Sequence, residues 1–375
     1  MSLFIGLMSG TSLDGVDGVL ADLGGDAANP TTIRVLGHHQ ASFPDTLRTQ
    51  LLHLNSRGDD ELHRAALAAN ALVRVYAEVV DALLLQCGAS AAQVCAIGAH
   101  GQTVRHRPQE FDGTGYTLQL MNGARLAELC GIDVVCDLRS RDVAAGGQGA
   151  PLVPALHAAL FAVPGEDIAV LNLGGIGNLS LLPADGAVRG FDCGPGNALL
   201  DLWCQQHRGQ AFDDQGRWAA QGQVDASLLQ RLLAEPFLRR APPKSTGRDL
   251  FNAPWLQAAL HCSTPALSPV DVQATLTEFS ACAAAQALKD HAPRTHHLLV
   301  CGGGAYNDHL MLRLAARLPG TVVASTAAAG MPPLQVEALA FAWLAQAFVA
   351  RRPGNLPTVT GARGPRVLGA LHPAG

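Results

Sequence analysis

The chain has 375 residues, 48% of them apolar and 15% charged, which is enough apolar surface for large cores and too little charge for a disordered protein. This length predicts about two or three domains. The formal net charge of −5 argues against broad electrostatic binding to nucleic acid, which needs clustered basic side chains.

Cysteine usage and the apolar segments predict a soluble protein of the cytoplasm. The nine cysteines are odd in number and form no C-x-x-C pair, which favours free thiols in a reducing compartment. The first apolar run has no basic residues before it and breaks at Ser9, so it does not read as a signal peptide. The apolar run 338–350 is too short to span a bilayer and predicts a buried helix. We therefore expect no membrane partner.

Apolar runs and helical periodicity alternate along the chain, which predicts an α/β fold. Strands at 3–8 and 15–23 flank a polar loop, and a helix with an acidic start is expected over 59–87. The middle of the chain predicts a strand entering a polar loop at 94–106, then strand–helix–strand at 116–138. A glycine-rich loop is expected from 137, and it leads to a helix near 151. The later segments predict paired strands from 167, a helix near 197, mostly helices over 226–292, and strand–turn–helix at 296–318.

The loop SGTSLDG at residues 9–15 is rich in groups that bind anions. It lacks the lysine of a P-loop and precedes a strand, so it would hold phosphate with backbone N–H groups and hydroxyls. Its aspartates are hard oxygen ligands that suit Mg²⁺, directly or through water. An ordinary hairpin turn uses similar residues. The candidate phosphate ligands are Gly10, Thr11, Ser12, Leu13, Asp14, Gly15, Val16 and Asp17, with Asp14 and Asp17 also the candidate metal ligands.

Two later glycine turns have the same character. One lies between two apolar strands, and the other follows a buried strand and opens a helix, although either alone also suits close packing. Their candidate nucleotide ligands are Gly174, Gly175 and Asn178 in the first turn, and Gly302, Gly303, Gly304 and Asn307 in the second.

In this order, the three turns resemble the two phosphate hairpins and the adenosine segment of the superfamily that includes acetate kinase, sugar kinases, chaperone ATPases and actin. The resemblance implies two actin-like (ribonuclease-H-like) lobes with a nucleotide cleft between them, and ATP and Mg²⁺ as cofactors. We assign residues 1–137 and 340–375 to lobe I, with the first hairpin. Residues 138–339 form lobe II, with the second hairpin, the adenosine segment and most of the substrate side.

Several polar residues near glycine-rich segments are candidates for the substrate. Asp192, in GFDCGPGN, follows a short strand, and the glycines leave space around a carboxylate that could accept a proton. The segment DLRSRDVAAGGQGAP contains Arg139, which could clamp an anion, and Asp142. His100 lies at a strand end, and Glu337 enters the apolar C-terminal helix. Turn formation, ion pairing, core packing and helix-dipole pairing are their alternative roles.

Seven segments carry a closer resemblance, which covers essentially the whole chain. They resemble the successive blocks of the anhydro-N-acetylmuramic acid kinase family, with Leu138 as a small departure where phenylalanine is expected. The segments are GLMSGTSLDGVDGVL, AIGAHGQTVRH, DLRSRDVAAGGQGAPLVP, LNLGGIGNLSLL, GFDCGPGNALLD, PKSTGRDLFN and VCGGGAYN.

This resemblance implies an enzyme of peptidoglycan recycling that uses ATP and water. The enzyme opens the 1,6-anhydro ring of anhydro-N-acetylmuramic acid and phosphorylates O6, giving N-acetylmuramic acid 6-phosphate and ADP. Asp192 is implied as the catalytic base. His100, Arg139, Asp142 and Glu337 are the candidates for the sugar. The oligomeric state stays open, and a homodimer is among the states that the sequence allows.

Other functions share parts of this pattern. Another sugar or acyl kinase of the superfamily would have the same three turns, so only the substrate-side segments argue against it. A glycoside hydrolase would pair Asp192 with Asp137 or Asp142, yet it would leave the nucleotide turns unexplained. A non-catalytic actin-like or chaperone ATPase would also bind ATP, but a long peptide-binding domain after the triglycine segment is missing from the sequence.

Overall fold

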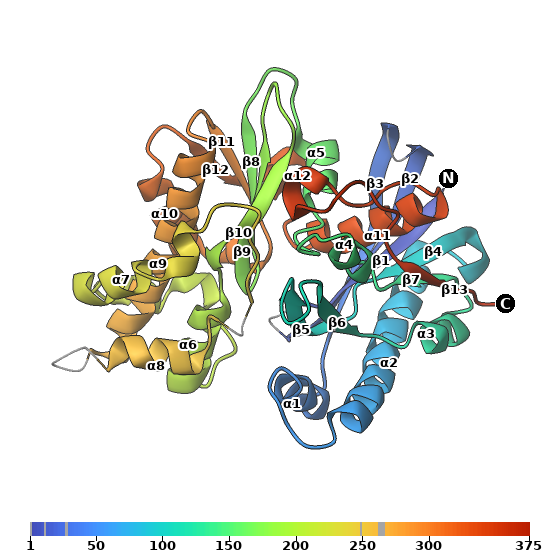
Figure 1. Ribbon diagram of the computed structural model, residues 1–375, viewed down its shortest axis with the longest axis horizontal. Helices are drawn as coiled ribbons and strands as arrows, with labels where there is room; N and C mark the ends of the chain where they lie inside the picture. Colours follow the sequence, from blue (N-terminus) through green and yellow to red (C-terminus); the bar gives the residue numbers. More distant parts are fainter. Residues whose placement is uncertain (1, 11–12, 27–28, 248–249, 262–266) are drawn as a thin grey trace. The chain divides into compact units, whose positions relative to one another are not determined.

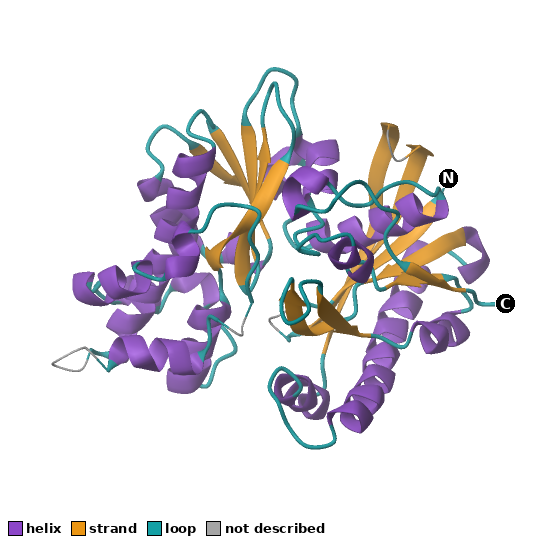
Figure 2. Ribbon diagram, in the orientation of Figure 1, coloured by secondary structure: helices purple, strands orange, loops and turns teal. Residues whose placement is uncertain are grey.

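The computed structural model describes residues 2–10, 13–26, 29–247, 250–261 and 267–375, and the chain forms two compact units (Figure 1). Unit 1 contains residues 1–160 and 334–375, and unit 2 contains residues 161–333. Each unit has a mixed sheet with helices packed on it (Figure 2), which confirms the predicted α/β fold. The predicted lobe limits stay a prediction.

The main sheet of unit 1 places the first glycine loop at the end of a central strand. The strands of this unit are β1 (Leu3–Met8), β2 (Gly15–Asp26), β3 (Asn29–Ser42), β4 (Val94–Ala99), β5 (Gln102–Pro108), β6 (Gly115–Leu120), β7 (Val134–Cys136) and β13 (Ala370–His372). The sheet order is β13–β7–β4–β1–β2–β3, and β5 and β6 form a separate pair. Because β1 pairs antiparallel with β2 and parallel with β4, the β1–β2 loop lies beside the residues that follow β4.

The helices of unit 1 come from both ends of the chain. They are α1 (Asp45–His53), α2 (Glu61–Cys87), α3 (Gly123–Cys130), α4 (Ser140–Ala144), α11 (Gln335–Val349) and α12 (Pro357–Thr360), while α5 (Pro154–Phe161) ends where unit 2 begins. Helix α2 confirms the helix predicted over 59–87, and it ends at Gly88, whose φ of 61° is the left-handed conformation that glycine adopts easily.

Helix α11 lies directly on the backbone of β1 and β4. A Cβ atom on Gly6 would come within 1.8 Å of the Ala338 carbonyl oxygen, and one on Gly98 within 1.9 Å of the Phe341 carbonyl oxygen. Most of α11 is buried, which confirms the buried helix predicted at 338–350. Within the described ranges, no helix combines the length and the apolar character needed to cross a membrane.

Helix α2 covers the opposite face of this sheet. A Cβ atom on Gly18 of β2 would lie 2.3 Å from the Val79 side chain of α2. Gly18 is the register partner of Leu7, the neighbour of Gly6, and successive residues of a strand face opposite sides. The N-terminal strands are thus enclosed by α2 on one face and α11 on the other.

Unit 2 carries the other two glycine turns at one edge of its sheet. Its strands are β8 (Ile168–Leu173), β9 (Ile176–Leu182), β10 (Arg189–Pro195), β11 (His297–Cys301) and β12 (Val322–Ser325), in the order β10–β9–β8–β11–β12. Its helices are α6 (Ala198–Arg208), α7 (Ala226–Leu233), α8 (Ala253–Leu260), α9 (Pro269–His291) and α10 (Asp308–Arg317), with the short 3₁₀ helix η5 (Gly303–Tyr306) before α10.

Helix α9 is the centre of unit 2 and is buried along most of its length. Ala284 and Leu288 pack with the sheet residues Leu171 and Phe191, while Phe279 belongs to a second core among α6, α7 and α8. The buried Glu278 of α9 is ion-paired with Arg313 and Arg317 of α10.

The ion pairs of Glu278 hold α10 against α9. The triglycine turn directly precedes α10, so these ion pairs also help to position the turn. Burial raises the pKa of the Glu278 carboxyl, but the hydrogen bonds and charges of Arg313 and Arg317 outweigh this, so the pKa lies below its usual value.

Two segments of unit 1 differ from the sequence predictions. The polar loop predicted after β4 is wrong beyond Gly101, because Gln102–Pro108 forms β5 and pairs with β6. Its polar side chains find partners there, since Arg105 pairs with Glu61 of α2 at 3.1 Å. The glycine-rich loop predicted from residue 137 contains the short helix α4.

Candidate active site

The first glycine loop of unit 1 is held by buried polar side chains. The Ser9 hydroxyl lies 2.8 Å from the Tyr76 hydroxyl of α2 and donates to the Gly101 carbonyl oxygen at 3.0 Å. The Gln102 amide donates from Nε2 to the Gly10 carbonyl oxygen, also at 3.0 Å. These contacts fix the start of the loop from the protein interior.

Leu13 and Val16 turn their side chains into the core of unit 1, where both are buried. A ligand at this loop would therefore meet their backbone and not their side chains. Gly15 lies against β3, because a Cβ atom there would come within 2.1 Å of the Ala41 carbonyl oxygen. Thr11 and Ser12 lie outside the described residues.

The two candidate metal ligands have different surroundings. Asp14 is exposed at the loop. Asp17 is half-buried, and its Oδ1 lies 3.2 Å from Nε2 of His38 on β3. Burial raises the pKa of the Asp17 carboxyl, although His38 opposes this. Asp14 is therefore the better placed of the two to meet a hydrated cation.

Among the sugar candidates of unit 1, His100 and Arg139 contact each other. His100 Nε2 lies 3.1 Å from Arg139 Nε and 2.9 Å from Nη2, while Arg139 Nη1 donates to the Gly149 carbonyl oxygen at 2.7 Å. Glu337 is half-buried in the first turn of α11, where a carboxylate interacts favourably with the helix dipole.

Asp142 is fully buried and accepts hydrogen bonds from distant parts of unit 1. Its Oδ2 accepts from the Gly149 N–H at 2.8 Å. Its Oδ1 accepts from the Thr360 hydroxyl at 2.8 Å and from the Asn355 amide at 2.7 Å. These contacts join α4 and the loop after it to the C-terminal segment, so Asp142 has a structural function whether or not it also meets the sugar.

We expect Asp142→Ala to lower the free energy of unfolding of unit 1 by at least about 3 kcal/mol. Hydrogen bonds to a charged group contribute about 1.5–3 kcal/mol each, and their loss leaves buried donors unpaired. Urea unfolding followed by circular dichroism measures this. Arg141→Ala, an exposed position of the same helix, is the matched control. Equal stability of the two variants would contradict the prediction.

The structure brings the two glycine turns of unit 2 together. A Cβ atom on Gly302, whose φ is 78°, would lie 2.5 Å from Asn172 Oδ1 and 2.8 Å from the Leu173 carbonyl oxygen. The Asn197 amide donates to the same Leu173 carbonyl oxygen at 2.9 Å. The Asn197 N–H donates to the carbonyl oxygen of Gly174 at 2.8 Å. Glycine is required at position 302 because the end of β8 approaches so closely.

The register of the sheet aligns Asp192 with these turns. Asp192 of β10 pairs with Asn178 of β9, which pairs with Asn172 of β8, which in turn pairs with Cys301 at the end of β11. Directly paired side chains lie within about 5.5 Å of each other. Asp192 therefore belongs to one row of residues that ends at the triglycine turn.

Two buried amide oxygens in this row accept no hydrogen bond from the part of the chain that the structure describes. They are Asn172 Oδ1 and Asn178 Oδ1. Buried polar atoms are nearly always satisfied in folded proteins, by protein groups, water or a ligand. The row therefore has the capacity to accept hydrogen bonds from a bound molecule.

The loop before residue 248 orients Asp192, which is itself buried. Asp192 Oδ2 accepts from the Thr246 N–H at 2.8 Å, and the Asp192 N–H donates to the Lys244 carbonyl oxygen at 3.2 Å. The Lys244 ammonium is also buried, donates to the Leu238 carbonyl oxygen at 3.0 Å and lies 4.9 Å from the centre of the Phe237 ring. The loop thus contacts both the backbone and the carboxylate of Asp192.

The last nucleotide candidate, Asn307, ends the triglycine turn. Its Oδ1 accepts from the Leu310 N–H at 2.9 Å and so caps α10, which leaves its amide nitrogen for other contacts. The helix predicted directly after the three glycines begins only at Asp308, after the 3₁₀ turn η5.

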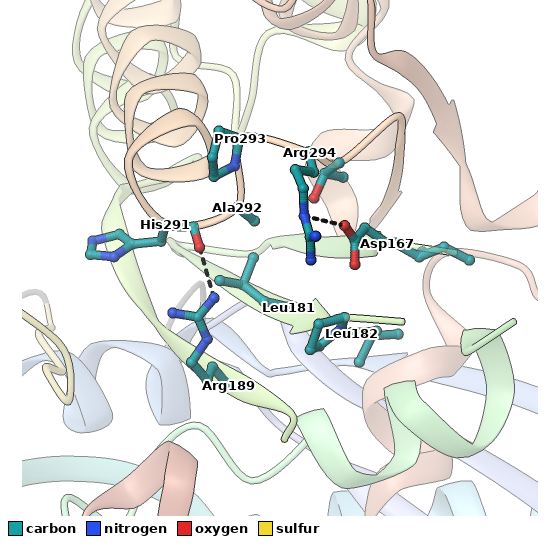
Figure 3. A pocket seen from close by; sticks show the side chains of 11 residues that line it. Asp167, Leu181, Leu182, Arg189, His291, Ala292, Pro293 and Arg294 are labelled. Atoms are coloured by element: carbon teal, nitrogen blue, oxygen red, sulfur yellow. Dashed lines mark hydrogen bonds and ion pairs between the residues drawn. The ribbon is translucent and has the colours of Figure 1, made fainter. Parts of the chain in front are cut away.

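A separate cavity of about 180 Å³ in unit 2 is lined by none of the predicted site residues (Figure 3). Arg189 donates to the His291 carbonyl oxygen at 2.8 Å there, and Arg294 pairs with Asp167 at 3.1 Å. Pockets that enclose a drug-sized ligand are typically about 300–1,000 Å³, so this cavity is too small for a nucleotide.

Sequence reasoning missed the residues that support the site. Tyr76 behind Ser9, Asn197 beside the glycine turns, and Thr360 at Asp142 each make their contact with a residue far away in the chain. The GPGN segment before α6 was a local signal for Asn197, but the other two had none.

Comparisons with known proteins cover nearly the whole chain. The family model "Anhydro-N-acetylmuramic acid kinase" matches residues 2–374. The anhydro-N-acetylmuramic acid kinase of Variovorax paradoxus is 62% identical, over 99% of this chain and 99% of its own. That of Bordetella petrii is also 62% identical, over 99% and 96%. A solved structure, the activator of 2-hydroxyisocaproyl-CoA dehydratase from Clostridium difficile with bound ADPNP, matches with a TM-score of 0.49 and 12% identity, over 93% of this chain and 96% of that chain.

Proposed function

This chain belongs to the anhydro-N-acetylmuramic acid kinase family, and we propose that it converts its sugar with Asp192 as the catalytic base. The family predicted from the sequence motifs is confirmed. In the proposed reaction, ATP, water and 1,6-anhydro-N-acetylmuramic acid give N-acetylmuramic acid 6-phosphate and ADP. The observation that carries the role of Asp192 is its place in the row Asp192–Asn178–Asn172, which ends at the glycine turns.

O6 is locked in the anhydro bridge and carries no proton to lose. The nucleophile is therefore a water molecule that attacks C1, and a base must take the proton from this water. Asp192 takes a proton from water, and the water oxygen forms a bond to C1. The C1–O6 bond breaks, O6 forms a bond to the γ-phosphorus, and ADP leaves. The Thr246 N–H, 2.8 Å from Asp192 Oδ2, would fix the direction of the carboxylate that takes the proton.

Phosphate and adenosine contacts complete the proposal. The backbone from Gly10 to Asp17 and the turn with Gly174, Gly175 and Asn178 would hold phosphates. Gly302, Gly303, Gly304 and Asn307 would lie near the adenosine. The orphaned oxygens of Asn172 and Asn178 support a polar ligand at this edge of the sheet.

We propose that Mg²⁺ is held at the first loop by Asp14, which is exposed, with the half-buried Asp17 as the weaker candidate. A divalent cation would neutralise negative charge that develops on the phosphate oxygens. On the sugar side, Arg139 is the proposed contact for an anionic group, and His100, Asp142 and Glu337 are the other candidates. Arg139 is preferred to His100 and Asp142 because it is half-buried, whereas they are buried.

We also propose that the reaction takes place in the cytoplasm, where ATP is available. The cysteines among the described residues form no disulfide, which fits a reducing compartment.

A homodimer remains part of the proposal, and light scattering of the purified protein tests it.

The test of the reaction uses purified protein, the anhydro-sugar, Mg²⁺ and ATP in water enriched in ¹⁸O. We expect the label at C1 and phosphate at C6, detected by mass spectrometry. A sugar that carries phosphate at C6 but no label at C1 would contradict the proposed route. Ring opening that proceeds without ATP would indicate a hydrolase instead.

A further inference from the structure

His100 uses both of its ring nitrogens inside unit 1. It follows β4 and is only 4% exposed. Nδ1 lies 3.0 Å from the Ser9 carbonyl oxygen, in the first glycine loop. Nε2 lies 3.1 Å from Nε and 2.9 Å from Nη2 of Arg139. The imidazole therefore stands between the backbone of the phosphate loop and the guanidinium proposed for the sugar.

The partners of His100 determine which nitrogen carries the proton. A guanidinium has only donors, so Nε2 must accept from Arg139. Nδ1 then carries the hydrogen and donates it to the Ser9 carbonyl oxygen. The neutral ring is also the stable one here, because burial and then the charge of Arg139 hold the pKa of His100 well below its usual value.

With both nitrogens engaged, the His100 ring has none left to bind a sugar hydroxyl. Arg139 is half-buried, and its contacts to Gly149 and His100 fix the plane of its guanidinium. A guanidinium in a fixed plane suits the bidentate recognition of a carboxylate, which the proposed function assigns to Arg139.

We infer that His100 is a positioning residue, which orients Arg139 toward the amino sugar and ties it to the phosphate loop through Ser9. This rests on the proposed function, in which Arg139 contacts the sugar and the loop contacts ATP. The Ser9 end of the link is itself fixed, because the Ser9 hydroxyl is bonded to Tyr76 and Gly101. His100 thus connects the two substrates without touching either.

Two conservative variants separate the two hydrogen bonds of His100. In His100→Asn, the amide occupies the position of Nδ1, so it keeps a donor for Ser9 and loses the acceptor for Arg139. In His100→Gln, the amide reaches the position of Nε2, so it keeps an acceptor for Arg139 and loses the donor for Ser9. If His100 served folding alone, the two variants would not differ in which substrate, the sugar or ATP, shows the larger rise in KM.

We expect a crossed result in steady-state kinetics. His100→Asn should raise the KM for the sugar about 10-fold or more, the scale for a lost hydrogen bond to a charged group, and change the KM for ATP little. His100→Gln should raise the KM for ATP more than the KM for the sugar. Parallel changes in both variants, or a wild-type KM for the sugar in His100→Asn, would overturn the inference.

A second measurement does not depend on the reaction. Long-range ¹H–¹⁵N spectra of the wild-type protein report the tautomer of each histidine, and His100→Asn assigns the His100 signal by its loss. We expect the neutral tautomer protonated at Nδ1. A proton at Nε2 would refute the positioning role even in an active enzyme. Absence of sugar turnover with the Nδ1 tautomer present would instead refute the proposed function.

Discussion

Asp192→Asn should lower kcat by at least roughly 10²-fold, the scale for losing a general base. Asparagine has the same shape and keeps an oxygen to accept from the Thr246 N–H, 2.8 Å away in the wild-type protein. It cannot take a proton from water, however, so binding and folding should survive while the chemical step fails. Initial rates at saturating ATP and sugar measure the effect.

The matched control is Asp185→Asn, an exposed carboxylate in the turn between β9 and β10 of the same unit. It should leave kcat unchanged. The thermal midpoints of both variants should match the wild-type value, which excludes misfolding as the cause. Turnover of Asp192→Asn within a few-fold of wild type would remove Asp192 from its proposed role.

Substitutions along the triglycine turn should have different effects at neighbouring positions. In Gly302→Ala, the added Cβ atom would meet Asn172 Oδ1 at 2.5 Å and the Leu173 carbonyl oxygen at 2.8 Å, at a φ of 78°. A left-handed backbone and a clash with backbone each cost about 1–3 kcal/mol. We expect the midpoint of unit 2 to fall by roughly 5–10 °C in differential scanning calorimetry.

Gly303→Ala is the matched control, because the added Cβ atom would lie 3.8 Å from its nearest described neighbour, Asn197 Nδ2. The thermal midpoint should therefore stay close to that of the wild type. If the proposed adenosine contact is correct, the KM for ATP should still rise, since a methyl group would stand where the nucleotide approaches. An equal loss of stability in both variants would contradict the packing described for this turn.

Local patterns in the sequence predict the long elements well. The acidic start and the closing Gly88 define α2, and the continuous apolar run defines α11, because both signals lie within the element itself. Strand β5 is different. Its sequence QTVRHRP looks like a loop, and it forms a strand only because β6 and Glu61 provide partners for its polar side chains.

The same distinction applies to the site. Glycine motifs identify the turns, because backbone approach requires glycine at positions such as Gly302. The environment of Asp142 could not be predicted, since its partner Thr360 lies 218 residues further along the chain. The sequence also predicts His100 as a sugar ligand, whereas in the structure Ser9 and Arg139 occupy its ring nitrogens.

The contact of α11 with Gly6 and Gly98 has a consequence for biosynthesis. The strand that leaves the ribosome among the first elements is covered by a helix that leaves it among the last. All of residues 161–333 are translated in the interval, so unit 2 can fold while the nascent N-terminal sheet still has one face open to water. A translation arrest before residue 335 would therefore yield a chain in which unit 2 can fold while one face of the unit 1 sheet stays uncovered.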